Sequence, residues 1–466
     1  MAPCPRSPSI RLGWLVAAAW AVQVACGGEP FRVEIVEPGD GWPVPLVELR
    51  TTHGLRFVSD NAGVIAIDAP EVMGVPTWFS IRGHGYGLEP DGFGHQGVRL
   101  VPQPGGTTRL EVRRTILARR IGRLTGGGLF AESQRAGVAH DAWTDTPGVF
   151  GCDSVQTATY RGSTFWVWGD TTEPRYPLGI FAATAAAGPS PTAAWTAPPL
   201  HVVFDLFRDV DGRPCGVCPM PGAGPTWVSG LAAVSDATGR ERLVASYVKI
   251  RNRLDPYEIG LCVWNDTAAR FDQHAVIWTR GDETPQQPPF PDGHASRWRD
   301  AGGREWLLFG NPLPRLRCPA TFEAWADRRT WETLATPADL ATVDGGRVAL
   351  HSGAIGRHPT LGRWCAVFTE RFGSSSAFGE VWYAEADEPS GPWGPAVKIL
   401  SHENQTFYNP VLHVADDGDG RPILLFEGTY TATFADHAEP TPRYEYNQIL
   451  YRLDLDDPAI AAVRTR

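Results

Sequence analysis

The chain has 466 residues, of which 42% are apolar and 20% charged, and its formal net charge is -10 at pH 7. This length allows two or three domains, and the acidic balance without a basic stripe excludes nucleic acid as the main partner. The abundance of Trp (18), Gly (51) and Pro (41) favours short strands joined by tight turns over long helices, so we expect an all-β protein.

The N-terminus is typical of an export signal, which we predict over residues 1–27. Arg6 and Arg11 precede LGWLVAAAWAVQVA, an apolar stretch too short to span a bilayer comfortably. We therefore expect an exported protein, periplasmic, extracellular or lipid-anchored at Cys26, with no transmembrane segment after signal removal. An exported compartment permits disulfides, so Cys215 and Cys218 are expected either to bridge a turn or to remain inert thiols.

Residues 30–112 alternate apolar and polar positions between Gly, Asn and Asp turns, which predicts a small N-terminal β-sandwich. The run WPVPLVELRTTHGLRFVSDNAGVIAI resembles the carboxypeptidase regulatory-like domain that is appended to exported bacterial proteins. This resemblance implies no catalytic residues in the sandwich. Residues 113–138 are expected to form a linker that docks against the next domain.

From residue 139 to residue 456 one pattern repeats: an apolar strand, a turn, and a second strand that ends in an aromatic residue followed by a polar one. The second strands are FWVWGDT, LVASYVKI, WLLFGNP, CAVFTER and ILLFEGT, and their aromatic anchors are Trp168, Tyr247, Phe309, Phe368 and Phe426. A period of about 60 to 80 residues with alternation inside each unit is typical of a propeller. The sequence therefore predicts a five-bladed β-propeller after the sandwich.

In a propeller blade, the start of the innermost strand and the end of the second strand lie at the same mouth of the central channel. Nearly all of these positions are polar in this sequence. The strand starts hold Asp153, Asp292, His294, His351 and Asn409, and the strand ends hold Asp170, Lys249, Asn311, Glu370 and Glu427. Ordinary roles compete for several of them, such as a turn cap for Asp170 or a solvated ion pair of Glu370 with Arg371. Asp153 is the hardest to assign to structure alone, because a buried lone carboxylate is costly.

The stretch DSVQTATYRGSTFWVWGD resembles the first blade of the five-bladed glycoside hydrolases of family 43, the arabinanases and β-xylosidases. The resemblance puts Asp153 at the position of their general base, with Ser154 in place of the usual Pro. It gives no general acid, because the second blade has TWVSG without an acid and the third offers only Asp292. The stretches DSVQ, GEVWYAEAD and TPRYEYNQ are also similar to exported bacterial proteins, a likeness that brings no known activity.

These patterns favour a glycoside hydrolase that uses two carboxyl groups on a poly- or oligosaccharide. We expect Asp153 as base, Glu427 as acid with Glu370 and then Asp292 as substitutes, and inversion with a water between the carboxyl groups. The expected substrate-binding residues are Asp170, Lys249, Asp292, His294, Asn311, His351, Asn409 and Tyr430, and the aromatic residues considered for sugar stacking are Trp143, Trp166, Trp227, Tyr408 and Tyr430.

No cofactor is expected, although carboxylates, Asn side chains and carbonyls on the channel axis are also compatible with Ca²⁺. The alternative function is a non-catalytic propeller that binds carbohydrate or protein. A lectin-like propeller would repeat its binding residues in every blade, whereas the polar positions here differ from blade to blade. That difference favours a single central site and therefore an enzyme.

Overall fold

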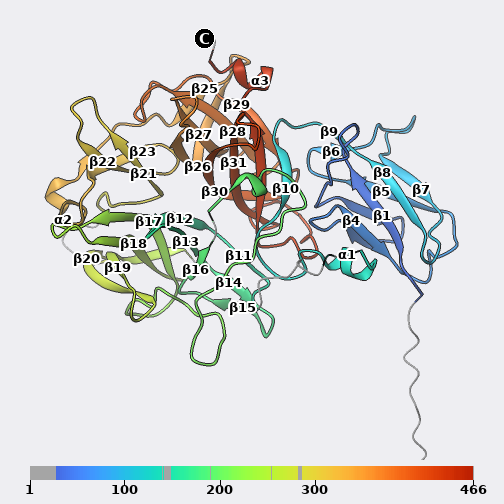
Figure 1. The fold of residues 1–466 in the computed structure, drawn as a ribbon, viewed down its shortest axis with the longest axis horizontal. Helices are drawn as coiled ribbons and strands as arrows, with labels where there is room; N and C mark the ends of the chain where they lie inside the picture. Colours follow the sequence, from blue (N-terminus) through green and yellow to red (C-terminus); the bar gives the residue numbers. More distant parts are fainter. Residues whose placement is uncertain are drawn as a thin grey trace, which may run out of the picture.

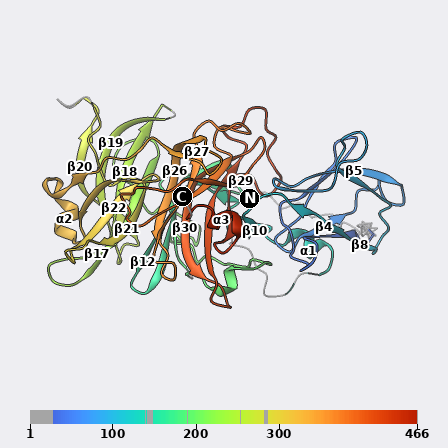
Figure 2. The same cartoon turned by 90° about the horizontal axis from the view of Figure 1, so that it is seen from above.

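The computed structural model describes residues 28–138, 140, 148–188, 190–252, 254–281 and 286–464. The predicted signal peptide and Trp143 lie outside the described residues. The chain forms two β-rich domains that lie side by side, a smaller one from the N-terminal part and a larger one from the rest (Figures 1 and 2). The all-β class, with a sandwich followed by a propeller, is confirmed.

The N-terminal domain is built from two sheets with a hydrophobic core between them. Its core includes Val33, Ile65 and Phe79, which are fully buried. One sheet has the order β4 (Val64–Ile67), β1 (Phe31–Val36), β8 (Thr107–Glu111); the other has the order β3 (Arg56–Val58), β2 (Glu48–Thr51), β5 (Thr77–Arg82), β7 (Gly97–Leu100); and β6 (Tyr86–Gly87) pairs with β9 (Arg113–Arg114). The likeness to a carboxypeptidase regulatory-like domain stays a prediction.

The larger domain consists of five antiparallel sheets that follow one another around a common centre. The strands of each sheet are given from the centre outward. The first sheet has β12 (Val155–Tyr160), β13 (Ser163–Trp168) and β16 (Thr184–Gly188), and the second has β17 (Thr226–Ser235), β18 (Glu241–Arg251), β19 (Asp255–Asn265) and β20 (Arg270–Thr279). The third has β21 (His294–Arg299), β22 (Glu305–Gly310), β23 (Pro314–Pro319) and β24 (Glu332–Thr333); the fourth has β26 (Arg347–Arg357), β27 (Trp364–Glu370), β28 (Glu380–Ala386) and β29 (Val397–Ser401); and the fifth has β30 (Thr406–Asp416), β31 (Pro422–Thr431), β32 (Asn447–Asp454) and β10 (Arg119–Arg123).

Smaller elements accompany the sheets of both domains. They are β25 (Asp339–Ala341), which pairs with the beginning of β26; the three-stranded sheet β11 (Gly151–Cys152), β14 (Thr171–Glu173), β15 (Tyr176–Ile180); the helices α1 (Ala131–Arg135), α2 (Phe322–Ala326) and α3 (Pro458–Ala461); and the 3-10 turns η1 (Ala193–Trp195) and η2 (Arg328–Thr330). No helix among the described residues has the length and apolar character that a bilayer crossing requires.

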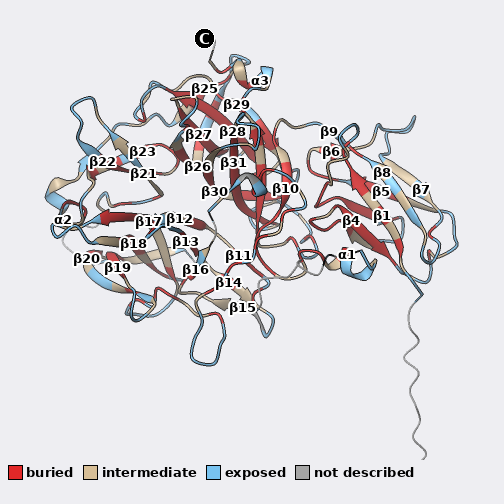
Figure 3. Ribbon diagram, in the orientation of Figure 1, coloured by how far each residue is buried: buried red, intermediate tan, exposed pale blue. Residues whose placement is uncertain are grey.

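The innermost strands close into a ring. β12 contacts β17, β17 contacts β21, β21 contacts β26, β26 contacts β30, and β30 contacts β12 again, and their labels surround one centre in Figure 1. The aromatic anchors predicted from the repeat are all buried in the second strands: Trp168, Tyr247, Phe309, Phe368 and Phe426. Figure 3 shows this buried interior in red. The anchors therefore pack the sheets against one another, as the repeat predicts.

The last sheet joins a strand that precedes the other propeller strands in the sequence to the last three strands of the chain. β10 forms its outer edge and pairs antiparallel with β32, from Arg119 opposite Arg452 to Arg123 opposite Ile449. The segment 113–138, expected as a linker, thus contributes a strand to the propeller. The sequence RRIGR has no strong alternation of apolar and polar residues, so its strand pairing depends on the unpaired edge that β32 offers.

Arg120 fixes the sandwich against this last sheet. Its side chain is fully buried and donates to the carbonyls of Pro45 (3.0 Å), Gly83 (2.9 Å) and His84 (2.7 Å) and to the hydroxyl of Tyr451 (3.0 Å). A buried guanidinium is tolerated only when such acceptors surround it. The two domains are therefore held by specific polar contacts as well as by apolar packing.

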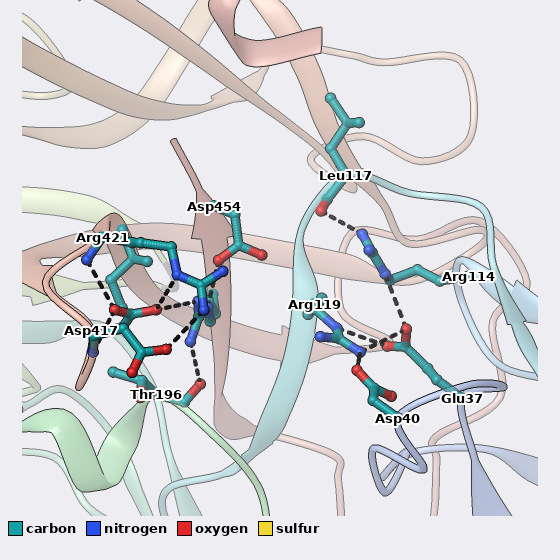
Figure 4. Close-up of polar contacts among 12 residues, drawn as sticks. Glu37, Asp40, Arg114, Leu117, Arg119, Thr196, Asp417, Arg421 and Asp454 are labelled. Carbon is teal, nitrogen blue, oxygen red and sulfur yellow. Dashed lines mark hydrogen bonds and ion pairs between the residues drawn. The ribbon is translucent and has the colours of Figure 1, made fainter. Parts of the chain in front are cut away.

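A second set of charges faces the junction from both sides (Figure 4). Arg119 donates to Glu37 (3.0 Å) and Asp40 (2.7 Å), while Asp417 in the propeller accepts from Arg452 (3.0 Å). Asp40, Arg119, Asp417 and Arg452 border a cavity of about 410 Å³ between the domains. Because the charges are paired with one another, we assign this cavity to the domain junction and not to a ligand site.

The six cysteines of the described chain are free thiols, and all except Cys215 are buried. Cys215 and Cys218, one expected pair, are not bridged. Burial raises the pKa of Cys318 and of Cys365 to about 12, so both are neutral at physiological pH. Of the two alternatives for Cys215 and Cys218, the structure has the free thiols.

Candidate active site at the junction of the first and last blades

The strand register brings the start of each innermost strand beside the end of its partner. Thr226 lies opposite Lys249, His294 opposite Gly310, and Leu350 opposite Glu370. In the last blade the bulge after Tyr408 is followed by Val411 opposite Glu427. The predicted strand-start and strand-end positions thus lie at the same end of their hairpins.

Hydrogen bonds between blades join these hairpin ends. The amide of Gly230 donates to the carbonyl of Gly293 (2.8 Å), and the amide of Gly353 donates to Oδ1 of Asn311 (2.8 Å). Asn409 bonds on both sides: its amide donates to Oγ of Ser352 (3.3 Å) and its Nδ2 donates to Oγ of Ser154 (2.7 Å). Neighbouring blades are therefore linked at one mouth. Asn311 and Asn409 brace the mouth, and their expected role in substrate binding stays a prediction.

Asp153 is the centre of the most polar cluster at this mouth. Its Oδ2 accepts hydrogen bonds from the hydroxyls of Tyr408 and Tyr446, both at 2.7 Å, and its Oδ1 accepts from the amide of Asp170 at 2.8 Å. Burial raises the pKa of Asp153, and the three donors act against that rise. The orientation of the carboxyl group is thus fixed by the amide that follows β13 and by two tyrosines of the last blade.

Asp170 differs from Asp153 because its Oδ1 is buried and has no hydrogen-bond partner. Burial, and after it the charge of Asp153, raise the pKa of Asp170 to about 7. Two neighbouring carboxyl groups do not both ionise readily, so the group with fewer donors keeps the proton. With a pKa of about 7, Asp170 carries its proton in part at neutral pH and more fully below it.

The backbone around this pair adopts left-handed conformations. Ser154 has φ 39°, Asn409 has φ 49° and Tyr446 has φ 59°, although none of them is glycine. Such residues cost about 1–3 kcal/mol each and gather where the surrounding structure holds a functional geometry. Bulges interrupt the register near the same end of β17, β26 and β30, another feature common beside active sites.

Glu427 lies deeper than the carboxyl pair. It is fully buried, its Oε1 lies 3.0 Å from Nε2 of His413, and its Oε2 has no partner. Burial raises its pKa, and the contact with His413 acts in the opposite direction. His413 in turn packs beside the ring of Trp166, which is itself fully buried. Neither Glu427 nor Trp166 offers a surface to a polysaccharide at the mouth.

Glu370 and Lys249 are engaged within their own blades. Oε2 of Glu370 accepts from the indole of Trp382 (2.9 Å) on the third strand of its sheet. Lys249 is buried and donates to the carbonyl of Gly224 (2.8 Å) and the hydroxyl of Thr226 (3.1 Å), and burial lowers its pKa. These contacts hold both side chains within their own blades; the substitute-acid role of Glu370 and the substrate-binding role of Lys249 stay predictions.

The third and fourth blades contribute polar groups with partners of their own. Asp292 is exposed and accepts from Oγ of Ser229 (2.8 Å). Burial lowers the pKa of His294 to about 4, with a smaller contribution from the charge of His413. His351 lies 3.2 Å from Oγ1 of Thr369, and burial, followed by the charge of Arg371, lowers its pKa to about 4. Both histidines are neutral at physiological pH.

Tyr430, expected at the mouth, lies in the domain junction. It is fully buried, and its hydroxyl contacts Nε2 of His84 in the sandwich (3.0 Å) and Oγ1 of Thr441 (2.8 Å). The expectation is wrong because successive residues of β31 point to opposite faces of the sheet. Only the neighbouring domain decides what the outward face touches.

The residue that sequence reasoning missed is Tyr446. It stands just before β32, in the TPRYEYNQ stretch, and contacts Asp153 across 293 residues of sequence. A tyrosine before a strand carries no local signal for such a contact. Among the described residues, no group of three or more His, Cys, Asp or Glu side chains is arranged to hold a metal ion, so Ca²⁺ on the axis stays an untested prediction.

No family model matches the chain, and no curated protein matches it in sequence. Solved structures with a similar fold include an exo-1,5-α-L-arabinanase from a bovine ruminal metagenomic library, 12% identical with a TM-score of 0.38, covering 67% of this chain and 94% of that one. A family 43 glycoside hydrolase from Bacillus licheniformis is 12% identical with a TM-score of 0.38, covering 65% and 72%. An exo-β-1,3-galactanase from Phanerochaete chrysosporium is 12% identical with a TM-score of 0.38, covering 69% and 65%. At this identity and with TM-scores below 0.5, the likeness carries no conclusion about activity, substrate or site residues.

Proposed function

We propose that this protein is an exported glycoside hydrolase that cleaves a poly- or oligosaccharide with Asp153 and Asp170 as its two carboxyl groups. The observation that carries the proposal is the pKa of Asp170, raised to about 7 beside Asp153. A carboxylic acid that keeps its proton near neutral pH can protonate a leaving oxygen, while a neighbouring carboxylate activates water. This division of roles is what glycoside hydrolysis requires.

Asp153 is the general base in this proposal. The hydroxyls of Tyr408 and Tyr446 donate to it and favour its ionised form. It takes a proton from the attacking water as the oxygen of that water bonds to the anomeric carbon. Asp170 gives its proton to the glycosidic oxygen as the bond from that oxygen to the anomeric carbon breaks. Asp153 gains one proton and Asp170 loses one, so a proton exchange with solvent returns the pair to its starting state.

The general acid moves from the residues expected from the sequence to Asp170. Glu427 is fully buried against His413, and Glu370 accepts from the indole of Trp382 within its own sheet. Asp292 lies with Ser229 at the junction of the second and third blades. Asp170 alone among the candidate carboxyl groups combines a raised pKa near neutrality with an electrostatic contact to Asp153. We also propose that the configuration at the anomeric carbon is inverted, and NMR tests this by identifying which anomer is released first.

The test uses the chain without residues 1–27, screened against soluble plant, algal and bacterial polysaccharides for new reducing ends. Asp153→Asn and Asp170→Asn should each lower turnover by roughly 10²–10⁴. On an activated aryl glycoside, whose leaving group needs little protonation, the loss in Asp170→Asn should shrink while the loss in Asp153→Asn persists. Asp211→Asn, at an exposed carboxylate that pairs with Arg213, is the matched control and should keep full turnover.

Two results would contradict the proposal. Full turnover by either site variant on both substrates would remove that carboxyl group from the chemistry. Retention of a polysaccharide without any new reducing ends, unchanged by both substitutions, would instead identify the non-catalytic binding propeller.

A further inference from the structure

Exposed aromatic rings gather beside the carboxyl pair. Phe372 is 76% exposed and Phe434 is 53% exposed, and they are among the few large apolar side chains that the described part of the chain leaves in solvent. Phe372 lies in the loop between β27 and β28, and Phe434 lies in the loop between β31 and β32. Both loops follow the second strands of their blades at the mouth. Exposed apolar groups that cluster in this way mark interaction sites.

The rings form a continuous row that ends at Asp153. The ring centre of Phe372 lies 6.0 Å from that of Phe378, Phe378 lies 6.0 Å from Phe434, and Phe434 lies 6.2 Å from Tyr408. Tyr408 donates to Asp153 at 2.7 Å. We call Phe372, Phe378 and Phe434 the aromatic strip. It runs from the fourth blade across the fifth and reaches the carboxyl pair through Tyr408.

The strip is held in place by its surroundings. Phe378 stacks on His351 with ring centres 3.8 Å apart and an interplanar angle of 16°, and its carbonyl accepts from the amide of Phe407 (3.0 Å). The loop of Phe434 is tied to β30 because the hydroxyl of Thr406 donates to the carbonyl of Thr433. Rings fixed before a ligand arrives lose little conformational freedom on binding.

The two outer rings are also held in an unfavourable backbone conformation. Phe372 has φ 54° and Phe434 has φ 63°. A left-handed conformation is rare for bulky residues, and it persists only where the surrounding structure enforces it. A large ring that is both exposed and strained contributes little to folding, so its presence at two places beside one site points to a ligand.

We propose that the aromatic strip binds a glycan chain and leads it to Asp153 and Asp170, so that the substrate is a chain of several sugar units. This inference rests on the proposed function, because it takes the carboxyl pair as the reacting end of the strip. The flat faces of Phe372 and Phe434 suit the apolar faces of successive sugar rings, and the hydroxyl and carboxyl groups at the Tyr408 end suit their hydroxyls. Three aromatic side chains, which cover about 150–250 Å² each when fully buried, fall short of the about 800 Å² that each partner contributes to a stable protein interface.

The experiment measures binding apart from hydrolysis. In the Asp170→Asn background, Phe372→Ala and Phe434→Ala are compared with their parent by affinity electrophoresis in soluble arabinan, arabinoxylan, galactan and laminarin. We expect at least one glycan to retard the parent, and each Ala substitution to weaken that binding about 2- to 10-fold, the range for loss of one aromatic stack. Phe434→Tyr, which keeps the ring, should bind as the parent does.

The matched control is Phe93→Ala, at a ring that is 91% exposed on the sandwich. It should also bind as the parent does. Absence of retardation in every glycan, or equal retardation of the parent and both strip variants, would overturn the strip. If Phe434-dependent binding is found while the unsubstituted protein releases no reducing ends, the strip stands and the proposed hydrolysis fails. If hydrolysis is found and does not depend on Phe372 or Phe434, the proposed function stands and the strip fails.

Discussion

Replacing Asp170 with Asn should stabilise the protein at alkaline pH while it removes activity. The folded-state pKa of Asp170 is raised from 3.8 to about 7. Between these two values the folded protein holds more protons than the unfolded chain, so the free energy of unfolding falls as the pH rises. The variant has no proton to lose at this position, and its stability should therefore be less dependent on pH.

The size of the effect follows from the shift in pKa. A rise of about three units corresponds to about 4 kcal/mol of destabilisation above pH 7. Most of it develops between pH 5 and pH 8, where the unsubstituted protein should lose about 2–3 kcal/mol that the variant keeps. Because the carboxyl group of Asp170 is only partly enclosed, the measured value should fall toward the lower end.

The assay is urea unfolding followed by tryptophan fluorescence at pH 5, 6, 7 and 8, with Asp211→Asn as control. The midpoint of Asp170→Asn should rise relative to the unsubstituted protein as the pH increases, and the midpoint of Asp211→Asn should follow the unsubstituted protein. Parallel curves for Asp170→Asn and the unsubstituted protein across this range would show that Asp170 is ionised at neutral pH. The general-acid role would then be lost, whatever the substrate.

Three further results are expected. Tyr446→Phe removes a hydrogen bond that lowers the pKa of Asp153, so the acidic limb of the pH profile of kcat/KM should move to higher pH, and an unmoved limb would contradict the base assignment. Tyr430→Phe should cost about 0.5–1.5 kcal/mol of stability through its lost contact with His84 but leave turnover unchanged, and reduced turnover would return Tyr430 to the site. A chain that begins at residue 139 lacks β10 and should unfold at lower urea than one that begins at residue 113; equal midpoints would show that β10 is dispensable.

The sequence by itself determined the repeat and the pair of aspartates. Alternation of apolar and polar residues is a local property of each strand, so the hairpins and the buried anchors such as Trp168 and Phe426 could be predicted from spacing alone. The spacing also put Asp153 just before and Asp170 just after the two strands of one hairpin, because the turn between those strands brings Val155 opposite Trp168.

Tertiary structure alone decided which of the polar positions could act. Tyr408 and Tyr446 reach Asp153 from 255 and 293 residues away, and no local pattern encodes a contact between blades that meet only when the ring closes. In the same way, the direction of a side chain at a strand end depends on what packs against it. Glu427 faces inward to His413 and Tyr430 faces the sandwich, although both follow the same aromatic anchor. Strand periodicity fixes which face of a sheet a residue occupies, but burial of that face depends on neighbours distant in the chain.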